Sequence, residues 1–362
     1  MKNHVYNFSA GPAVLPEEAL KKAQENLLGL PGVGMSVLEI SHRSKPFAEI
    51  IEAAEMNIRK LMNIPENYRV MFLQGGALLQ FAMLPMNLLG GKSADYIITG
   101  TWSKKARSEA KLVGETRVIW DGGESNFNSL PTNEELRAAV NSDAAYVYYT
   151  SNETIQGVQF PTEPEVDVPL VCDASSEFFY KPINIQKYGC VYACAQKNCG
   201  PAGVTLVIMR DDFVARSPEL PSLLNYKKLS AENSMLNTPP CFSIYMVKLV
   251  TDWLLNTVGG VEKMYEINKA KAALLYDVID GSDGFYLGHA QKSCRSLMNV
   301  PFKMQTDALD KVFLEEAAKE NLCSLAGHRS VGGFRASIYN AMPVQGVECL
   351  ASFMKNFMQK HG

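Results

Sequence analysis

The sequence lacks any apolar run long enough to cross a bilayer, and it contains no run of basic residues. Its 35 lysines and arginines and 38 acidic residues give a formal net charge of −3. A basic footprint for nucleic acid is therefore absent, and no membrane-spanning helix is expected. The first residues also lack the basic and apolar regions of a secretory signal. These absences predict a cytoplasmic protein whose partners are neither membranes nor nucleic acids.

Histidine is scarce, with 5 residues, and the 8 cysteines are scattered among apolar segments. Cys190, Cys194 and Cys199 lie close together, but their spacing is not that of a zinc site and no histidine is near them in the sequence. We therefore expect buried, reduced cysteines that act as small hydrophobic residues, and no bound metal.

Strand and helix signals alternate along much of the chain. Strands are predicted at 68–73, 94–99, 117–120, 144–149, 168–173, 189–195 and 204–209, and helices at 106–112 and 133–140. This alternation predicts a three-layer α/β domain with a mostly parallel sheet. Helical patterns at 243–256 and 261–279 predict a connector into a smaller α+β domain. We place the large domain at 16–257 and the small one at 258–362, with residues 1–15 packing near the small one.

Lys197 is a lone cation between two uncharged, β-prone segments, in a turn bounded by Gly200 and Pro201. A buried ammonium is costly unless it is paired or neutralised, and a Schiff base with a carbonyl cofactor would neutralise it. The alternative is a lysine at a strand end whose ammonium reaches solvent.

Asp173 ends the predicted strand that precedes the Lys197 strand. Ligands of α/β sheets gather at the carboxyl ends of the strands, so Asp173 and Lys197 are expected to face one cavity. Chemistry based on pyridoxal phosphate (PLP) needs such a pair, because a lysine holds the aldehyde and a carboxylate keeps the pyridine nitrogen protonated. Taken alone, Asp173 also suits a turn or a helix cap.

Two further features follow predicted strands. Gly75 and Gly76 precede a helical segment, so the free amides and the dipole at its start suit an anionic phosphate. Trp102 follows the strand at 94–99, where an indole can stack on a planar ligand or pack in the core.

Several long segments carry a resemblance to the phosphoserine aminotransferase family, PLP enzymes of fold type I and the class V group. The matching segments are 6–13, 40–44, 152–157, the stretches around Asp173 and Lys197, 236–240 and 327–343. The resemblance implies the fold of that family, with a large PLP-binding α/β domain and a small C-terminal α+β domain. It also implies a homodimer with shared active sites.

The resemblance also implies roles for individual residues. Lys197 and Asp173 would be catalytic. The cofactor would be held by Ala77, Leu78, Trp102, Thr154, Asp173, Gln196 and Lys197, together with Asn237 and Thr238 of the neighbouring subunit. Many relatives carry further glycine, and often arginine, where this chain has 77–79, so backbone amides would have to replace that charge at the phosphate.

Substrates with two anionic ends require several cations, and arginine binds carboxylate and phosphate oxygens in bidentate fashion. The resemblance assigns the α-carboxylate to Arg335 and the distal phosphate or carboxylate to His42, Arg43, His328 and Arg329. Any one of these arginines, considered singly, also suits a solvated surface position.

The implied reaction is reversible amino transfer from glutamate to 3-phosphohydroxypyruvate, which gives O-phospho-L-serine and 2-oxoglutarate in serine biosynthesis. Some members of the family also serve pyridoxine synthesis. Two other classes stay open: a PLP lyase such as a cysteine desulfurase, and a binding module that keeps the fold without activity. Gln196 disfavours the lyase, which usually has histidine before the lysine, and intact Lys197, Asp173 and Trp102 disfavour the module.

Overall fold

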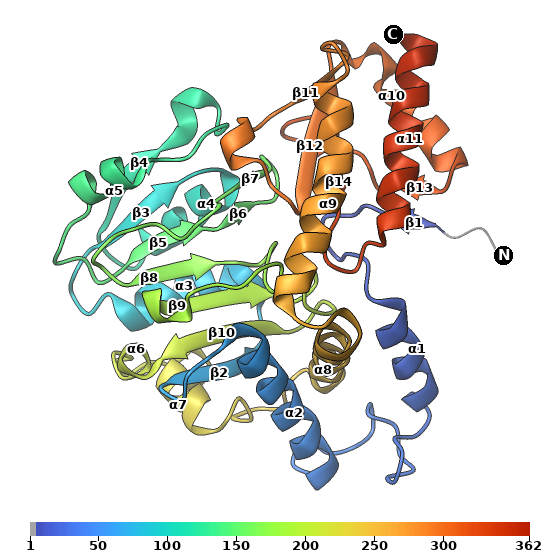
Figure 1. Ribbon diagram of the computed structural model, residues 1–362. Coiled ribbons are helices and arrows are strands. Elements are labelled where there is room, and N and C mark those ends of the chain that lie inside the picture. The colour runs from blue at the N-terminus through green and yellow to red at the C-terminus, as the bar shows by residue number, and fades with distance from the viewer. Residues whose placement is uncertain (1–4) are drawn as a thin grey trace.

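The computed structural model describes residues 5–362, and its largest sheet has seven strands (Figure 1). In sheet order they are β2 (Tyr68–Leu73), β10 (Thr205–Arg210), β9 (Tyr188–Cys194), β8 (Leu170–Asp173), β5 (Val147–Thr150), β3 (Ala94–Ile98) and β4 (Thr116–Asp121). Only β10 runs antiparallel to its neighbours in this sheet, so the prediction of a mostly parallel sheet is confirmed.

Helices cover both faces of this sheet, because successive residues of each strand point to opposite sides. In β2, Val70 and Phe72 join one hydrophobic cluster, while Met71 and Leu73 join the other. The first cluster contains residues of α1 (Glu17–Asn26), α2 (Lys45–Met62), α5 (Asn133–Ala139) and α8 (Cys241–Trp253). The second contains residues of α3 (Gly76–Leu88), α4 (Thr101–Ala110), α6 (Asp211–Val214) and α7 (Tyr226–Ala231). The predicted three-layer architecture is thus confirmed.

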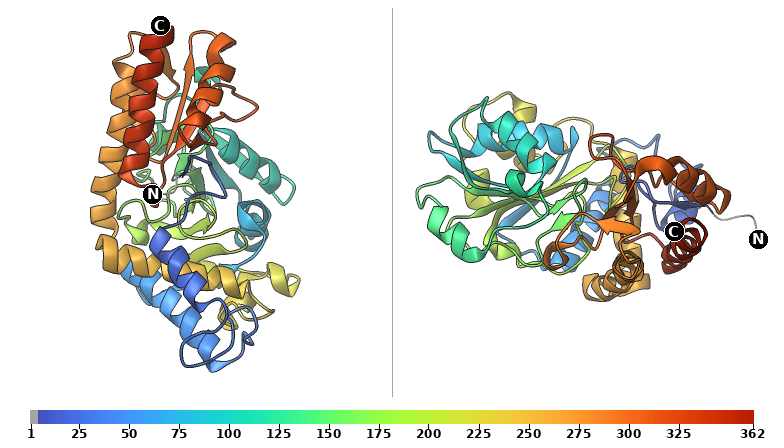
Figure 2. Two further views of the ribbon diagram at one scale, coloured as in Figure 1. Left: turned by 90° about the vertical axis from the view of Figure 1, so that its right-hand side faces the viewer. Right: turned by 90° about the horizontal axis from the view of Figure 1, so that it is seen from above.

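The C-terminal part has its own antiparallel sheet and its own hydrophobic cluster. The sheet consists of β11 (Tyr286–Gly288), β12 (Asn299–Met304) and β14 (Phe334–Ser337). Its helices are α9 (Val261–Asp280), α10 (Asp310–Lys319) and α11 (Val344–His361), and Figure 2 shows α9 beside α11. A π-helical turn at Leu254–Val258 joins α8 to α9. The N-terminal β1 (Tyr6–Asn7) pairs with β13 (Leu322–Cys323), while the domain boundary at 257 stays a prediction.

Two sequence-based boundaries were wrong by several residues. β5 begins at Val147 rather than at 144, and α4 begins at Thr101 rather than at 106. The early start of α4 has a physical cause, because the buried carboxylate of Glu153 accepts hydrogen bonds from the first amides of the helix. That partner is remote in sequence, so the local pattern does not reveal it. No helix among residues 5–362 combines the length and apolar character needed to cross a membrane.

Candidate active site

The loops that follow β2, β3, β8 and β9 meet at one edge of the main sheet, where the parallel strands end. They enclose a cavity of about 210 Å³. Its lining residues are Gly75, Gly76, Ala77, Leu78, Trp102, Asp173, Ser175, Cys194, Gln196 and Lys197. Most of the residues predicted to hold a cofactor therefore lie together, although they are far apart in sequence.

Lys197 lies in the loop between β9 and β10, and its side chain is held in place by Thr154. The lysine Nζ donates a hydrogen bond to Thr154 Oγ1 over 2.8 Å and lies 5.3 Å from the centre of the Trp102 ring. Thr154 sits in the turn between β6 (Asn152–Glu153) and β7 (Val158–Gln159). The ammonium thus lies beside an aromatic ring and a hydroxyl, and the family resemblance assigned both residues to the same site.

Asp173 is the last residue of β8, and only 4% of it is exposed. Burial raises the pKa of its carboxyl above the usual value, while hydrogen bonds from Ser175 and the positive charge of Lys197 lower it. The backbone N–H of Ser175 donates to Asp173 Oδ1 over 2.9 Å. A buried carboxylate in a cavity favours a ligand that brings a positive charge or a proton to it.

The start of α3 forms the third wall of the cavity. Gly75 has a φ of 90° and Gly76 a φ of 64°, the left-handed region that favours glycine. A Cβ atom on Gly75 would lie 2.4 Å from Leu79 Cδ2, so that position has no room for a side chain, whereas Gly76 is required by its backbone conformation alone. The first amides of a helix have no acceptor within the helix, and they carry its positive dipole end. Ala77 and Leu78 therefore lie where an anion is stabilised.

The lining of this cavity fits PLP. Lys197 supplies an amine for its aldehyde, Asp173 a buried carboxylate for its ring nitrogen, and the start of α3 free amides for its phosphate. The Trp102 ring borders the same cavity. Residues 5–362 contain no group of histidine, cysteine, aspartate and glutamate side chains arranged to hold a metal ion. Cys190, Cys194 and Cys199 are free and buried, as expected.

Glu153 is a site residue for which the sequence analysis proposed no role. It is fully buried, and its carboxylate accepts hydrogen bonds from Trp102 N at 2.9 Å, Ser103 N at 2.8 Å and Ser103 Oγ at 2.7 Å. Burial raises the pKa of Glu153, whereas the bonds from Ser103 and Trp102 lower it. The carboxylate therefore fixes the helix start that carries Trp102. The glycine at position 100 is the sequence feature that accompanies this contact. A Cβ atom there would lie 2.5 Å from Glu153 Cδ, so the close approach of the carboxylate requires glycine.

A neighbouring cavity of about 410 Å³ contains two of the predicted substrate residues, His328 and Arg335. Ile155, which follows Thr154 in the chain, lines the same cavity. Arg335 Nε is buried and has no hydrogen-bond partner within residues 5–362, and burial lowers the pKa of the guanidinium. A half-buried guanidinium with an unpaired Nε is suited to an anionic ligand.

The remaining predicted residues do not join these cavities within one chain. His42 and Arg43 lie just before α2, and Arg329 is exposed on the loop that precedes β14; none of them lines either cavity. Thr238 is exposed, and Asn237 Nδ2 donates to Gln74 Oε1 over 3.4 Å, beside Gly75.

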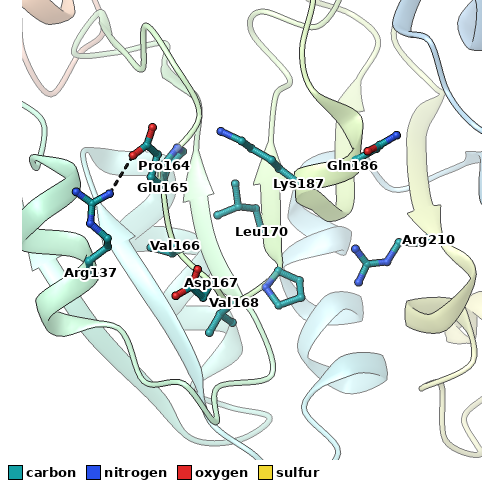
Figure 3. A pocket seen from close by; sticks show the side chains of 11 residues that line it. Arg137, Pro164, Glu165, Val166, Asp167, Val168, Leu170, Gln186, Lys187 and Arg210 are labelled. Carbon is teal, nitrogen blue, oxygen red and sulfur yellow. Dashed lines mark hydrogen bonds and ion pairs between the residues drawn. The ribbon is translucent and has the colours of Figure 1, made fainter.

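A cavity of about 580 Å³ opens at the opposite edge of the sheet (Figure 3). It lies beside Leu170 and Arg210, the first residue of β8 and the last of antiparallel β10. The Arg137–Glu165 ion pair, with an N–O distance of 2.9 Å, borders it. None of the predicted site residues lines this cavity, so the size of a cavity does not locate the chemistry.

Comparisons with known proteins agree with this geometry. The family model described as "Aminotransferase class-V" matches residues 5–350. A phosphoserine aminotransferase of Rhodopirellula baltica is 54% identical over 362 residues, covering 99% of this chain and 96% of that protein.

Two solved structures give the same result. Phosphoserine aminotransferase from Bacillus circulans subsp. alkalophilus superposes with a TM-score of 0.96 at 45% identity, covering 99% of both chains. PLP-bound phosphoserine aminotransferase from Trichomonas vaginalis gives a TM-score of 0.92 at 39% identity, covering 97% of this chain and all of that one. By sequence and by fold, the chain belongs to the class V aminotransferase family, and within it to the phosphoserine aminotransferases.

Proposed function

We propose that this chain is a PLP-dependent aminotransferase that moves an amino group reversibly between glutamate and 3-phosphohydroxypyruvate. The products are O-phospho-L-serine and 2-oxoglutarate, and the reaction belongs to serine biosynthesis. The placement of Lys197 and Asp173 around one cavity is the main support, together with the names of relatives at about half identity. The proposal includes a cytoplasmic location, and a part in pyridoxine synthesis stays a prediction.

PLP, when bound, supplies an electron sink that stabilises negative charge at the α-carbon of an amino acid. Asp173 would hold the proton on the pyridine nitrogen, and Trp102 would cover one face of the ring. Gln196 and the amides of Ala77 and Leu78 would hold the phosphate. Each assignment follows from a wall of the cavity that these residues line.

Lys197 would have two tasks. Its amine would hold the cofactor, and its Nζ, when free, would remove the proton from the substrate α-carbon as a general base. Thr154 Oγ1 accepts a hydrogen bond from this nitrogen, which limits the directions in which the amine can point. Orientation of this kind is a large part of enzymatic rate enhancement.

Substrate specificity would come from the cations. The guanidinium of Arg335, whose Nε has no hydrogen-bond partner within the described residues 5–362, would bind the α-carboxylate, and His328 in the same cavity would face the distal anion. His42, Arg43 and Arg329 lie outside the cavities of a single chain. We therefore propose a homodimer in which a second copy brings some of these residues, and also Asn237 and Thr238, to the site.

A comparison of amino donors tests the proposed reaction. The purified chain, supplied with PLP and 2-oxoglutarate, is assayed with phosphoserine, serine, alanine and aspartate. We expect kcat/KM for phosphoserine to exceed that for serine by at least about thirtyfold, because charge-paired phosphate contacts of this kind are worth about 2 to 5 kcal/mol. Equal or better turnover of serine or alanine would remove the phosphate pocket from the account.

A further inference from the structure

Lys271 is a fully buried cation in the middle of α9, outside both cavities described above. Its Nζ donates hydrogen bonds to three backbone carbonyls: Ile338 O at 3.0 Å, Tyr339 O at 2.7 Å and Met342 O at 3.2 Å. No acidic side chain among residues 5–362 forms an ion pair with it, and burial lowers the pKa of Lys271 to about 7. An ammonium has three N–H donors, so these carbonyls match it in number.

The three carbonyls belong to one short segment, the turn 338–342. This turn joins β14, which carries Arg335, to α11. The N-terminal segment connects this turn to the cofactor cavity. Tyr339 Oη donates a hydrogen bond to Ala10 O of that segment over 2.8 Å. That segment lies against the Lys197 loop, where Ala13 N donates to Gln196 O over 2.9 Å.

The turn also contacts the Lys197 loop directly. Asn340 N donates to Asn198 Oδ1 over 2.9 Å, and Asn198 is the neighbour of Lys197. The side chain of Asn340 is itself fixed, since its Nδ2 donates to Phe179 O at 3.0 Å and its Oδ1 accepts from Asn268 Nδ2 at 2.8 Å. Asn268 lies on α9, close to one turn before Lys271. Lys271 and Asn268, both on α9, therefore hold the turn 338–342. This turn directly follows the strand of Arg335 and contacts the loop of Lys197.

We propose that Lys271 is a positioning residue, which fixes the turn 338–342 and thereby sets the placement of Arg335 relative to Lys197. This inference rests on the proposed function, in which Arg335 binds the α-carboxylate while Lys197 acts at the α-carbon. Substitution of Lys271 removes a donor from all three carbonyls and leaves Tyr339 O only the bond from Met342 N at 2.9 Å. Buried carbonyls that lose their donor are driven to find new partners. Movement of the turn would then change the distance between Arg335 and Lys197.

Lys271→Met tests the inference, because it keeps an unbranched side chain that is only one atom shorter and removes the donors. Lys269→Met is the matched control on the same helix, since Lys269 is exposed and its Nζ contacts only neighbours on that helix, Glu266 at 2.7 Å and the Tyr265 ring at 4.8 Å from its centre. The first readout is amide hydrogen exchange in the protein without cofactor. We expect protection to fall by about tenfold or more in segments 8–13, 195–200 and 334–342 of Lys271→Met, with little change in β2, β3 and β10.

The second readout is kinetic. Lys271→Met should lower kcat/KM for phosphoserine by about tenfold to a hundredfold, because small displacements of reacting groups are costly, while Lys269→Met stays near the wild-type value. A uniform loss of protection across all strands, or unchanged kcat/KM, would overturn the inference. If Lys271→Met does not fold, Tyr339→Phe replaces it. That variant removes the bond to Ala10, and it should reduce protection at 8–13 and leave the main sheet unchanged; unchanged protection at 8–13 would also overturn the inference.

Failure of this inference and failure of the proposed function are distinguishable. A wild-type chain without activity towards phosphoserine contradicts the proposed function, whatever Lys271 does. The exchange experiment uses no substrate and no cofactor, so it reports on the turn itself.

Discussion

Lys197 and Thr154 are joined by a hydrogen bond, in which the lysine Nζ donates to the threonine Oγ1 over 2.8 Å. We predict that Thr154→Val lowers kcat by about tenfold or more, because a hydrogen bond to a charged group contributes roughly 1.5 to 3 kcal/mol. Thr154→Ser keeps the hydroxyl and should stay close to the wild type. Steady-state kinetics of both variants check this. If Thr154→Val has the same kcat as the wild type, the hydrogen bond does not orient the amine.

Substitution of Asp173 should lower kcat/KM more than substitution of an exposed carboxylate of the chain does. A neutral amide cannot hold the proton on a pyridine nitrogen, so Asp173→Asn should lose at least about 2 to 3 kcal/mol of transition-state stabilisation. Asp167→Asn is the control, since Asp167 is exposed at the opposite edge of the sheet. If kcat/KM is the same in Asp173→Asn and in the wild type, Asp173 serves only as a cap for the following turn.

The proposed homodimer leads to a mixing experiment. Lys197→Ala and Arg329→Ala, each inactive or weak alone, are combined under conditions that exchange subunits. If Arg329 acts across the interface, each mixed dimer has one site with both residues intact, and activity should recover to about a quarter of the wild-type value. Recovery that never exceeds the sum of the two separate variants would place Arg329 in the site of its own subunit.

Asp280 gives a prediction about stability rather than activity. Its carboxylate pairs with Arg295 at 2.8 Å and with Lys292 at 2.9 Å, and these partners lower its pKa from 3.8 to about 2. Because the folded pKa lies below the unfolded one, the stabilisation is complete above the unfolded value and is lost as pH falls through about 2.

Asp280→Asn should therefore lower the free energy of unfolding at pH 7 by about 1 kcal/mol, a value reduced for partial exposure of the pair. Urea unfolding measured from pH 7 downwards should show this difference shrinking below about pH 4. Asp277→Asn, an exposed position on the same helix, is the control. A difference that is constant with pH would mean that the ion pair is not its cause.

The sequence predicted that Lys197 and Asp173 face one cavity, and the structure places both in its lining, whereas their catalytic roles stay predictions. The signals for this placement are local. Lys197 and Asp173 are charged residues that directly follow or end uncharged strands, and a parallel sheet brings such strand ends to one edge. The positions of the strands followed from the same apolar runs. Resemblance to a family added Thr154, which no local pattern marks as a partner of Lys197.

The parts that the sequence analysis missed depend on contacts between distant segments. Glu153 caps a helix that begins about fifty residues earlier in the chain, so the start of α4 could not be predicted from the local pattern. Lys271 meets its carbonyls only when α9 packs against the turn 338–342. His42 and Arg43 are not brought to the site within one chain, and their proposed role depends on a second copy.

Reduction with borohydride tests the central claim most directly, since the claim is that Lys197 holds the cofactor. The purified chain incubated with PLP is reduced, digested and mapped by mass spectrometry. The account predicts a visible absorption band that reduction abolishes, with the pyridoxyl label on Lys197, and no stable label in Lys197→Ala, which should still bind the cofactor without a covalent bond. A label on a different lysine, or multiple turnovers by Lys197→Ala near the wild-type rate, would contradict it.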